Sequence, residues 1–185
     1  EPLAILAGDA LQTLAFEALA SRPHPRLGAL ITTLAQAAGR DGMAAGQAID
    51  LGAVGAPMDL AALQAMHQHK TGALIRAAVR LGALVAVDES DPRVAALDRY
   101  ASAMGLAFQI HDDVLDVTGD TQTLGKTSGA DARRDKPTYP ALLGVAQAQR
   151  RARDLLDEAL AALEPLGEAG QPLAALARFM IDRDH

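Results

Sequence analysis

Three aspartates in the segment Phe108–Asp116 are the residues best suited to chemistry. Asp112 and Asp116 are one helical turn apart, so they share a face, and Gln109 stands on that face three residues before Asp112. Asp113 is expected about a quarter-turn away, towards the rim. Like charges at this spacing destabilise a helix by a few tenths of a kcal/mol, so a cation is expected to offset them. The ligands are hard oxygens and the chain has no cysteine, which suits Mg²⁺, an ion that binds one or two carboxylates together with substrate phosphates.

The other interpretation of these acids is a solvated face near a helix end. The residues around them are apolar, which puts the acids on an otherwise buried helix: Met104, Leu106, Phe108, Ile110, Val114 and Leu115. This setting weakens the solvated interpretation, since a mostly apolar helix turns little surface to water, but both interpretations stay open at this point.

Lysine is scarce in this chain, so the position of each lysine is informative. Lys70 lies mid-helix with Met66 and Leu74 one turn away, and its stem can lie along an apolar cavity wall. Lys126 and Lys136 lie in an irregular stretch beyond the acidic helix, where flexible ammonium groups suit a diphosphate held through Mg²⁺. The alternatives are a surface lysine at position 70 and solvated loop charges at the other two positions.

Other polar residues favour structural interpretations. His67, His69 and His111 have no clean ligand set around them, so we expect them not to bind a metal. Gln47 and Asp50 reach one helical face, and a buried polar pair is the simpler interpretation.

The elements that must position these residues are helices. Half of the residues are hydrophobic but only 3% are aromatic, so the core must be built from Ala and Leu, which are the best helix formers. Asp59 is expected in the first turn of a helix, and Asp91 before Pro92 is typical of an N-cap with proline at the first position. The stretch from Gly119 to Pro137 is too long for an idle loop in a compact helical domain. We expect one all-α domain over 1–185, with helices at 3–20, 26–38, 41–52, 58–87, 92–118, 138–163 and 171–183.

Composition excludes several classes of function. The net charge of −6 and the pI near 5.3 leave no broad basic field for nucleic acid. Zero cysteines exclude disulfides, thiolate zinc sites and a cysteine nucleophile, and they fit a reducing, cytoplasmic compartment. No apolar run reaches the ~18–20 uncharged residues of a membrane span, and the start of the chain lacks the features of a signal peptide.

Taken together, these segments resemble the trans-isoprenyl diphosphate synthases (the polyprenyl synthetase family), most closely the bacterial farnesyl diphosphate synthases. The stretch from Asp112 to Asp116 matches the second aspartate-rich motif of that family, a DDxxD pattern that is weak alone. In order with a Lys-Thr motif before it and two lysines after it, the pattern is specific. The matching segments run almost end to end: Gly8–Phe16, Gly46-Gln47 with Asp50, His69–Gly72, Phe108–Asp116, Gly119-Asp120, Leu124–Thr127, Asp131 and Lys136–Pro140.

The resemblance implies a fold and a reaction. The fold is a bundle of antiparallel helices around a deep central cavity, in a homodimer. The reaction condenses an allylic diphosphate, dimethylallyl or geranyl, with isopentenyl diphosphate to give farnesyl diphosphate or a similar short product. It proceeds by Mg²⁺-assisted ionisation, condensation and elimination.

The resemblance also implies a role for each matching residue. The metal ligands would be Asp112, Asp113 and Asp116, with Asp113 in support. The contacts to the allylic diphosphate would be Lys70, Lys126 and Lys136. Thr71 and Gln109 would lie against the reacting carbon, so the catalytic set is Lys70, Thr71 and Gln109.

One departure from the family pattern is large. Family members carry a first aspartate-rich motif, followed by arginines, just upstream of the position that matches Glu1, and these residues do not contain it. We therefore expect the C-terminal portion of a longer synthase, a partial bundle that is inactive by itself. The alternatives are a class I terpene cyclase, a catalytically silent synthase-like regulatory subunit and a generic helical scaffold. The few aromatic residues and the absence of asparagine weigh against the cyclase.

Overall fold

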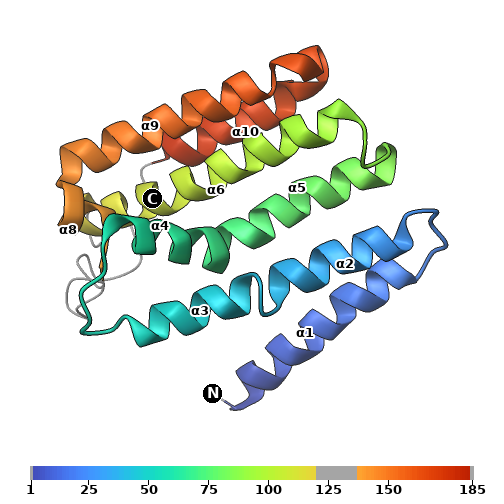
Figure 1. Cartoon of the computed structure of the whole chain (residues 1–185), viewed down its shortest axis with the longest axis horizontal. Coiled ribbons are helices and arrows are strands. Elements are labelled where there is room, and N and C mark those ends of the chain that lie inside the picture. Colours follow the sequence, from blue (N-terminus) through green and yellow to red (C-terminus); the bar gives the residue numbers. More distant parts are fainter. Residues whose placement is uncertain (1, 120–136, 184–185) are drawn as a thin grey trace.

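The computed structural model describes residues 2–119 and 137–183, and within them the chain is helical, with no β-strand (Figure 1). The all-α prediction is therefore confirmed for the described residues. The helices are α1 (Pro2–Ala20), α2 (Leu27–Ala38), α3 (Met43–Gly52), α4 (Leu60–His67), the π-helical turn η1 (Gln68–Gly72), α5 (Ala73–Ala86), α6 (Pro92–Thr118), α8 (Tyr139–Leu143), α9 (Val145–Ala162), the 3-10 helix η3 (Glu164–Gly170) and α10 (Gln171–Asp182).

The helices form rows that follow the order of the chain. Figure 1 shows α1, then α2 with α3, then α4 with α5, then α6, then α9 beside α10. The main hydrophobic cluster joins α6 to α4, α8, α9 and α10. Its largest fully buried side chains are Tyr139, Leu63, Met104 and Ile110, and alanines fill much of the rest. Such small side chains let helices approach closely, which puts the backbone of α6 near its neighbours.

The starts of two helices are fixed by aspartates. Asp91 accepts a hydrogen bond from the N–H of Arg93 at 2.9 Å, with Pro92 at the first helical position, as predicted. Hydrogen bonds from the Arg93 side chain and backbone lower the pKa of Asp91 to about 2. Asp59 accepts a hydrogen bond from the N–H of Ala62 at 2.8 Å, so it is the N-cap of α4 and not a first-turn residue.

Two predicted helices are interrupted in the structure. The expected helix 58–87 contains the wider π-helical turn η1, which divides α4 from α5. The expected helix 138–163 is divided between α8 and α9 at Gly144, whose φ of +79° is a left-handed conformation that ends a helix. Both interruptions fall beside residues of chemical interest, Lys70 in the first case and Tyr139 in the second.

Helix α1 differs from the others because none of its residues is buried. Leu3, Leu6 and Leu11 are each more than 60% exposed. By length and composition alone, α1 is also apolar enough to cross a membrane, although it contains Asp9 and Glu17. These two acids interrupt the apolar sequence of α1, so the helix is not the uncharged run that the sequence analysis considered, and one such helix is weak evidence for a span.

Candidate functional site

The turn η1 lies directly against the backbone of α3. A Cβ atom at Gly46 would be 2.1 Å from the backbone nitrogen of Lys70 and 2.4 Å from its Cα. Since no side chain fits in that space, only glycine allows α3 to approach η1 so closely. This contact fixes the position of the Lys70 backbone relative to α3.

A second glycine contact joins η1 to α6. A Cβ atom at Gly105 would be 3.0 Å from the Cα of Gly72 at the end of η1. Gln109, Asp112 and Asp116 follow Gly105 by four, seven and eleven residues, so they continue along the same face of α6. We name η1 with Gly46 and Gly105 the glycine junction. The face of α6 that carries two of the predicted metal ligands is therefore the face that contacts the turn carrying Lys70 and Thr71.

Lys70 is paired inside the glycine junction. Its Nζ donates a hydrogen bond to Oδ2 of Asp50 at 2.7 Å, and Asp50 stands one turn after Gly46 on α3. The Asp50 side chain is 7% exposed and that of Lys70 is 30% exposed, so the acid is buried and the ammonium reaches its edge. The burial expected for Asp50 is confirmed, whereas Gln47 is only half-buried. An ammonium group carries three donors, so Lys70 keeps others for a second partner.

Asp112 has the cationic partner that its charge required, but that partner is an arginine. Arg183, just after α10, donates from Nη2 to Oδ1 of Asp112. Its guanidinium lies 4.8 Å from the centroid of the Phe108 ring, and the backbone oxygen of Arg183 is 3.1 Å from Nε2 of His111. Nothing in the local sequence pattern indicated this residue, because the contact joins positions 71 residues apart. Lys126 and Lys136, the expected cations, lie outside the described residues.

Asp113 faces away from the rim on which it was expected and is buried, with 8% of its surface exposed. Its Oδ2 accepts a hydrogen bond from the backbone N–H of Tyr139 at 2.9 Å and lies 3.5 Å from Nε2 of His67. The rings of His67 and Tyr139 stack, with centroids 5.8 Å apart. Burial raises the pKa of Tyr139 to about 12; the carboxylate of Asp113 also raises it, and Arg151 lowers it.

The donor set on α6 fits a magnesium ion that is completed by a substrate. Among residues 2–119 and 137–183, no three histidine, cysteine or acidic side chains gather closely enough to hold an ion by themselves. Two carboxylates on adjacent turns, Asp112 and Asp116, are nevertheless the usual protein contribution to Mg²⁺ bound with phosphates. The guanidinium of Arg183 on Asp112 demonstrates that this carboxylate attracts a cation in the folded chain.

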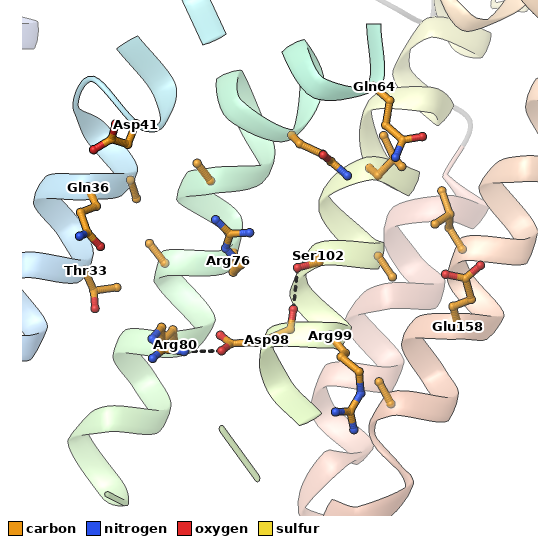
Figure 2. Close-up of a pocket in the computed structure, with 18 of the residues that line it drawn as sticks. Thr33, Gln36, Asp41, Gln64, Arg76, Arg80, Asp98, Arg99, Ser102 and Glu158 are labelled. Atoms are coloured by element: carbon orange, nitrogen blue, oxygen red, sulfur yellow. Dashed lines mark hydrogen bonds and ion pairs between the residues drawn. The ribbon is translucent and has the colours of Figure 1, made fainter. Parts of the chain in front are cut away.

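A large cavity lies elsewhere in the structure. It has a volume of about 1330 Å³ and is lined from α2, α4, the first residue of η1, α5, α6 and α9. Figure 2 shows Arg76, Arg80 and Arg99 around it, with Arg80 paired to Asp98. We name it the arginine cavity. None of the predicted site residues that the structure describes lines it, and the sequence analysis did not single out its arginines.

Comparisons with known proteins agree with the resemblance. The model of the polyprenyl synthetase family matches residues 1–169. The farnesyl diphosphate synthase of Escherichia coli (strain K12) is 53% identical over 192 residues, which include all of this chain and 64% of that protein. The chain thus spans just under two thirds of the length of this relative.

Solved structures share the arrangement of helices. Geranylgeranyl pyrophosphate synthetase from Pyrococcus horikoshii has a TM-score of 0.87 at 28% identity, covering 99% of this chain and 68% of its own. The geranyltransferase from Helicobacter pylori, crystallised with magnesium and isoprenyl diphosphate, has a TM-score of 0.79 at 33% identity. That match covers 98% of this chain and 59% of the geranyltransferase.

Proposed function

The chain belongs to the polyprenyl synthetase family, and we propose that the protein condenses an allylic diphosphate with isopentenyl diphosphate. The product we propose is farnesyl diphosphate, on the strength of the 53% identity to a farnesyl diphosphate synthase. The relatives are synthases and transferases by name, which gives no support to a terpene cyclase or to a silent subunit. That these 185 residues alone are inactive stays a prediction.

One observation carries the proposal. The glycine junction brings the turn with Lys70 and Thr71 against the face of α6 that continues to Asp112 and Asp116. A cationic donor on one element and a pair of carboxylates on the other are the two halves of a site for a metal-bound diphosphate. The contact between Gly72 and Gly105 holds these halves together without intervening side chains.

We propose that fixed charges of the site assist ionisation by stabilising the leaving diphosphate. Lys70, held by Asp50, would donate to a terminal oxygen of the leaving diphosphate, and Lys126 and Lys136 would add further positive charge. Asp112 and Asp116, with Asp113 in support, would hold Mg²⁺, which when bound supplies electrostatic stabilisation of the leaving group. Such fixed charges contribute several kcal/mol because they need no reorganisation as charge develops.

The residues beside the reacting carbon have a different task. Thr71 and Gln109 are both half-buried and belong to the two sides of the glycine junction. We infer that their oxygen dipoles face the allylic cation and stabilise it until the double bond of isopentenyl diphosphate attacks. The final proton is lost to the departing diphosphate, so no side chain need act as a dedicated base.

A product assay tests this function. The protein in its natural length is incubated with geranyl diphosphate, isopentenyl diphosphate and Mg²⁺, and products are identified by mass spectrometry. We expect farnesyl diphosphate, its loss on chelation of Mg²⁺ and its recovery when Mg²⁺ is restored. A cyclic hydrocarbon formed from geranyl diphosphate alone would contradict the assignment in favour of a cyclase. Binding without turnover would contradict it in favour of a silent subunit.

Two further proposals concern the oligomeric state of the protein and its location in the cell. We propose a cytoplasmic homodimer, supported by the family match and by the absence of cysteine. The large exposed apolar side chains of α1 support a covering partner on that helix. Light scattering and cell fractionation test these two points; a monomer or a membrane-bound protein would contradict them.

A further inference from the structure

The buried trio of His67, Asp113 and Tyr139 joins Asp113, which supports the proposed metal site, to two residues that have no task in the reaction just described. His67 is the last residue of α4 and immediately precedes η1. Asp113 stands between the other two predicted metal ligands of α6, Asp112 and Asp116, and Tyr139 begins α8. Three elements that are distant in sequence therefore meet at one carboxylate.

The contacts within the trio are specific. Oδ2 of Asp113 accepts from the N–H of Tyr139 at 2.9 Å and has Nε2 of His67 at 3.5 Å. The imidazole is stacked on the Tyr139 ring, with an interplanar angle of 18°. The side chains of His67 and Asp113 are 7% and 10% exposed, so this meeting is shielded from water. A buried carboxylate is strongly destabilising unless donors surround it, which ties its position to theirs.

His67 also needs this carboxylate. Among the described residues, neither of its ring nitrogens has a hydrogen-bond partner, and both are buried. The group closest to satisfying one of them is Oδ2 of Asp113. A buried donor without a partner is costly, so the pair constrains the distance between the end of α4 and the middle of α6.

That distance sets the geometry of the site. A π-helical turn is rare and persists only where surrounding contacts determine it. The turn η1 is held at its end by the contact between Gly72 and Gly105, and at its start by the residue that precedes it, His67. Because Asp113 adjoins Asp112, any shift of the trio also turns the α6 face that carries Asp112 and Asp116.

We propose that His67 is a positioning residue for the synthase reaction: through Asp113 it fixes the orientation of η1 relative to the metal-binding face of α6. The inference rests on the proposed function, since it concerns the same diphosphate site. His67 touches neither substrate nor metal in this account, and its effect passes through the carboxylate of Asp113.

The test uses binding of inorganic diphosphate at saturating Mg²⁺, measured by equilibrium dialysis on the natural-length protein. His67→Phe keeps a ring over Tyr139 and removes both nitrogens, whereas His67→Gln restores a donor towards Asp113 without the ring. We expect His67→Phe to weaken binding by roughly tenfold, in line with the loss of an outer-shell partner of a metal ligand, and His67→Gln to recover much of it. Equal binding by His67→Phe and the unaltered protein would overturn the inference.

Two controls separate positioning from general loss of stability. Tyr100→Phe removes another hydrogen bond of α6, from the hydroxyl to the backbone oxygen of Leu173 at 2.9 Å, far from the trio in sequence. We expect it to lower the melting temperature about as much as His67→Phe while leaving binding unchanged, and an equal loss of binding would overturn the inference.

In addition, His67→Phe combined with Asp113→Asn should weaken binding no further than Asp113→Asn alone; additive losses would show that His67 does not act through Asp113. If the unaltered protein binds no diphosphate, the proposed function fails first and this inference fails with it.

Discussion

Two polar regions flank the α5–α6 pair, and they are built in opposite ways. In the glycine junction the backbones nearly touch, and the half-buried Lys70 is paired with the buried Asp50 of another helix. In the arginine cavity the helices stand apart around alanines such as Ala77 and Ala103, and arginines line a hollow of about 1330 Å³. The arginine cavity is lined by none of the described residues that the family motifs identify. The site that we propose is therefore marked by backbone contact and paired charges, and not by this cavity.

The largest difference is expected when one charge is removed on the face of α6 that continues from the glycine junction and another in the arginine cavity. Asp112→Ala should reduce turnover by about a hundredfold or more, because Asp112 is a proposed metal ligand and its loss would leave charge on the leaving diphosphate unneutralised, which costs several kcal/mol. Arg76→Ala, which alters the arginine cavity, should leave turnover within about twofold. Steady-state kinetics of the two variants measure both effects. A larger loss from Arg76→Ala would place the chemistry in the cavity.

The next comparison concerns glycines. Gly46→Ala forces a methyl group to 2.1 Å from the backbone of Lys70, and overpacking of this kind costs typically about 1–3 kcal/mol and occasionally more. Gly82→Ala in α5 meets nothing within 4 Å, so it should stabilise the helix by about 0.5–1 kcal/mol. Denaturant unfolding measures the two changes in free energy. If both substitutions change the free energy of unfolding in the same direction, close packing at Gly46 does not stabilise the glycine junction.

Ion pairs give a smaller difference. Lys70→Met removes a donor from a buried carboxylate, which costs about 1–3 kcal/mol. Arg80→Met removes a guanidinium that pairs with the half-exposed Asp98 and the exposed Glu89, which costs under about 1 kcal/mol because water screens such pairs. Thermal unfolding of both variants tests the order. A greater loss from Arg80→Met would reverse the contrast between the two regions.

The smallest expected effect is a shift in titration. Burial holds the pKa of Tyr139 at about 12, above the ordinary value of 10, so its neutral form is favoured in the folded state. The contribution of neutral Tyr139 to the free energy of unfolding is therefore complete below pH 10, and it is lost as the pH rises from 10 towards 12. The chain has two tyrosines and no tryptophan, so Tyr100→Phe leaves Tyr139 as the single source of phenolate absorbance. A midpoint near pH 10 in the folded protein would show that the Tyr139 environment is open to water.

Local sequence was enough to predict the helices but not the joints between them. Alanine and leucine favour helix through each residue's own backbone, and Asp91 with Pro92 caps α6 through neighbours two residues away, so both could be read directly. The π-helical turn depends on contacts of Gly46 and Gly105 with a segment far away in the chain. No periodicity in the local sequence contains that information.

The candidate site was predictable to the same degree. The shared face of Asp112 and Asp116 follows from helical geometry, whereas the pairing of Lys70 with Asp50 joins two helices and could not be predicted from local spacing. The burial of Asp113 was missed because its partner, Tyr139, is 26 residues later in the sequence. Arg183 was missed for the same reason, since only the return of α10 towards α6 brings it to Asp112.

The most direct test of the central claim is a crystal structure of the natural-length protein with Mg²⁺ and inorganic diphosphate. We predict density for the anion beside the glycine junction, within contact of the Lys70 ammonium and bridged by metal to Asp112 and Asp116. Arg183 should then have moved away from the carboxylate of Asp112, because the metal takes over the neutralisation of that charge. Anion density among the arginines of the arginine cavity, with Asp112 still paired to Arg183, would contradict the account.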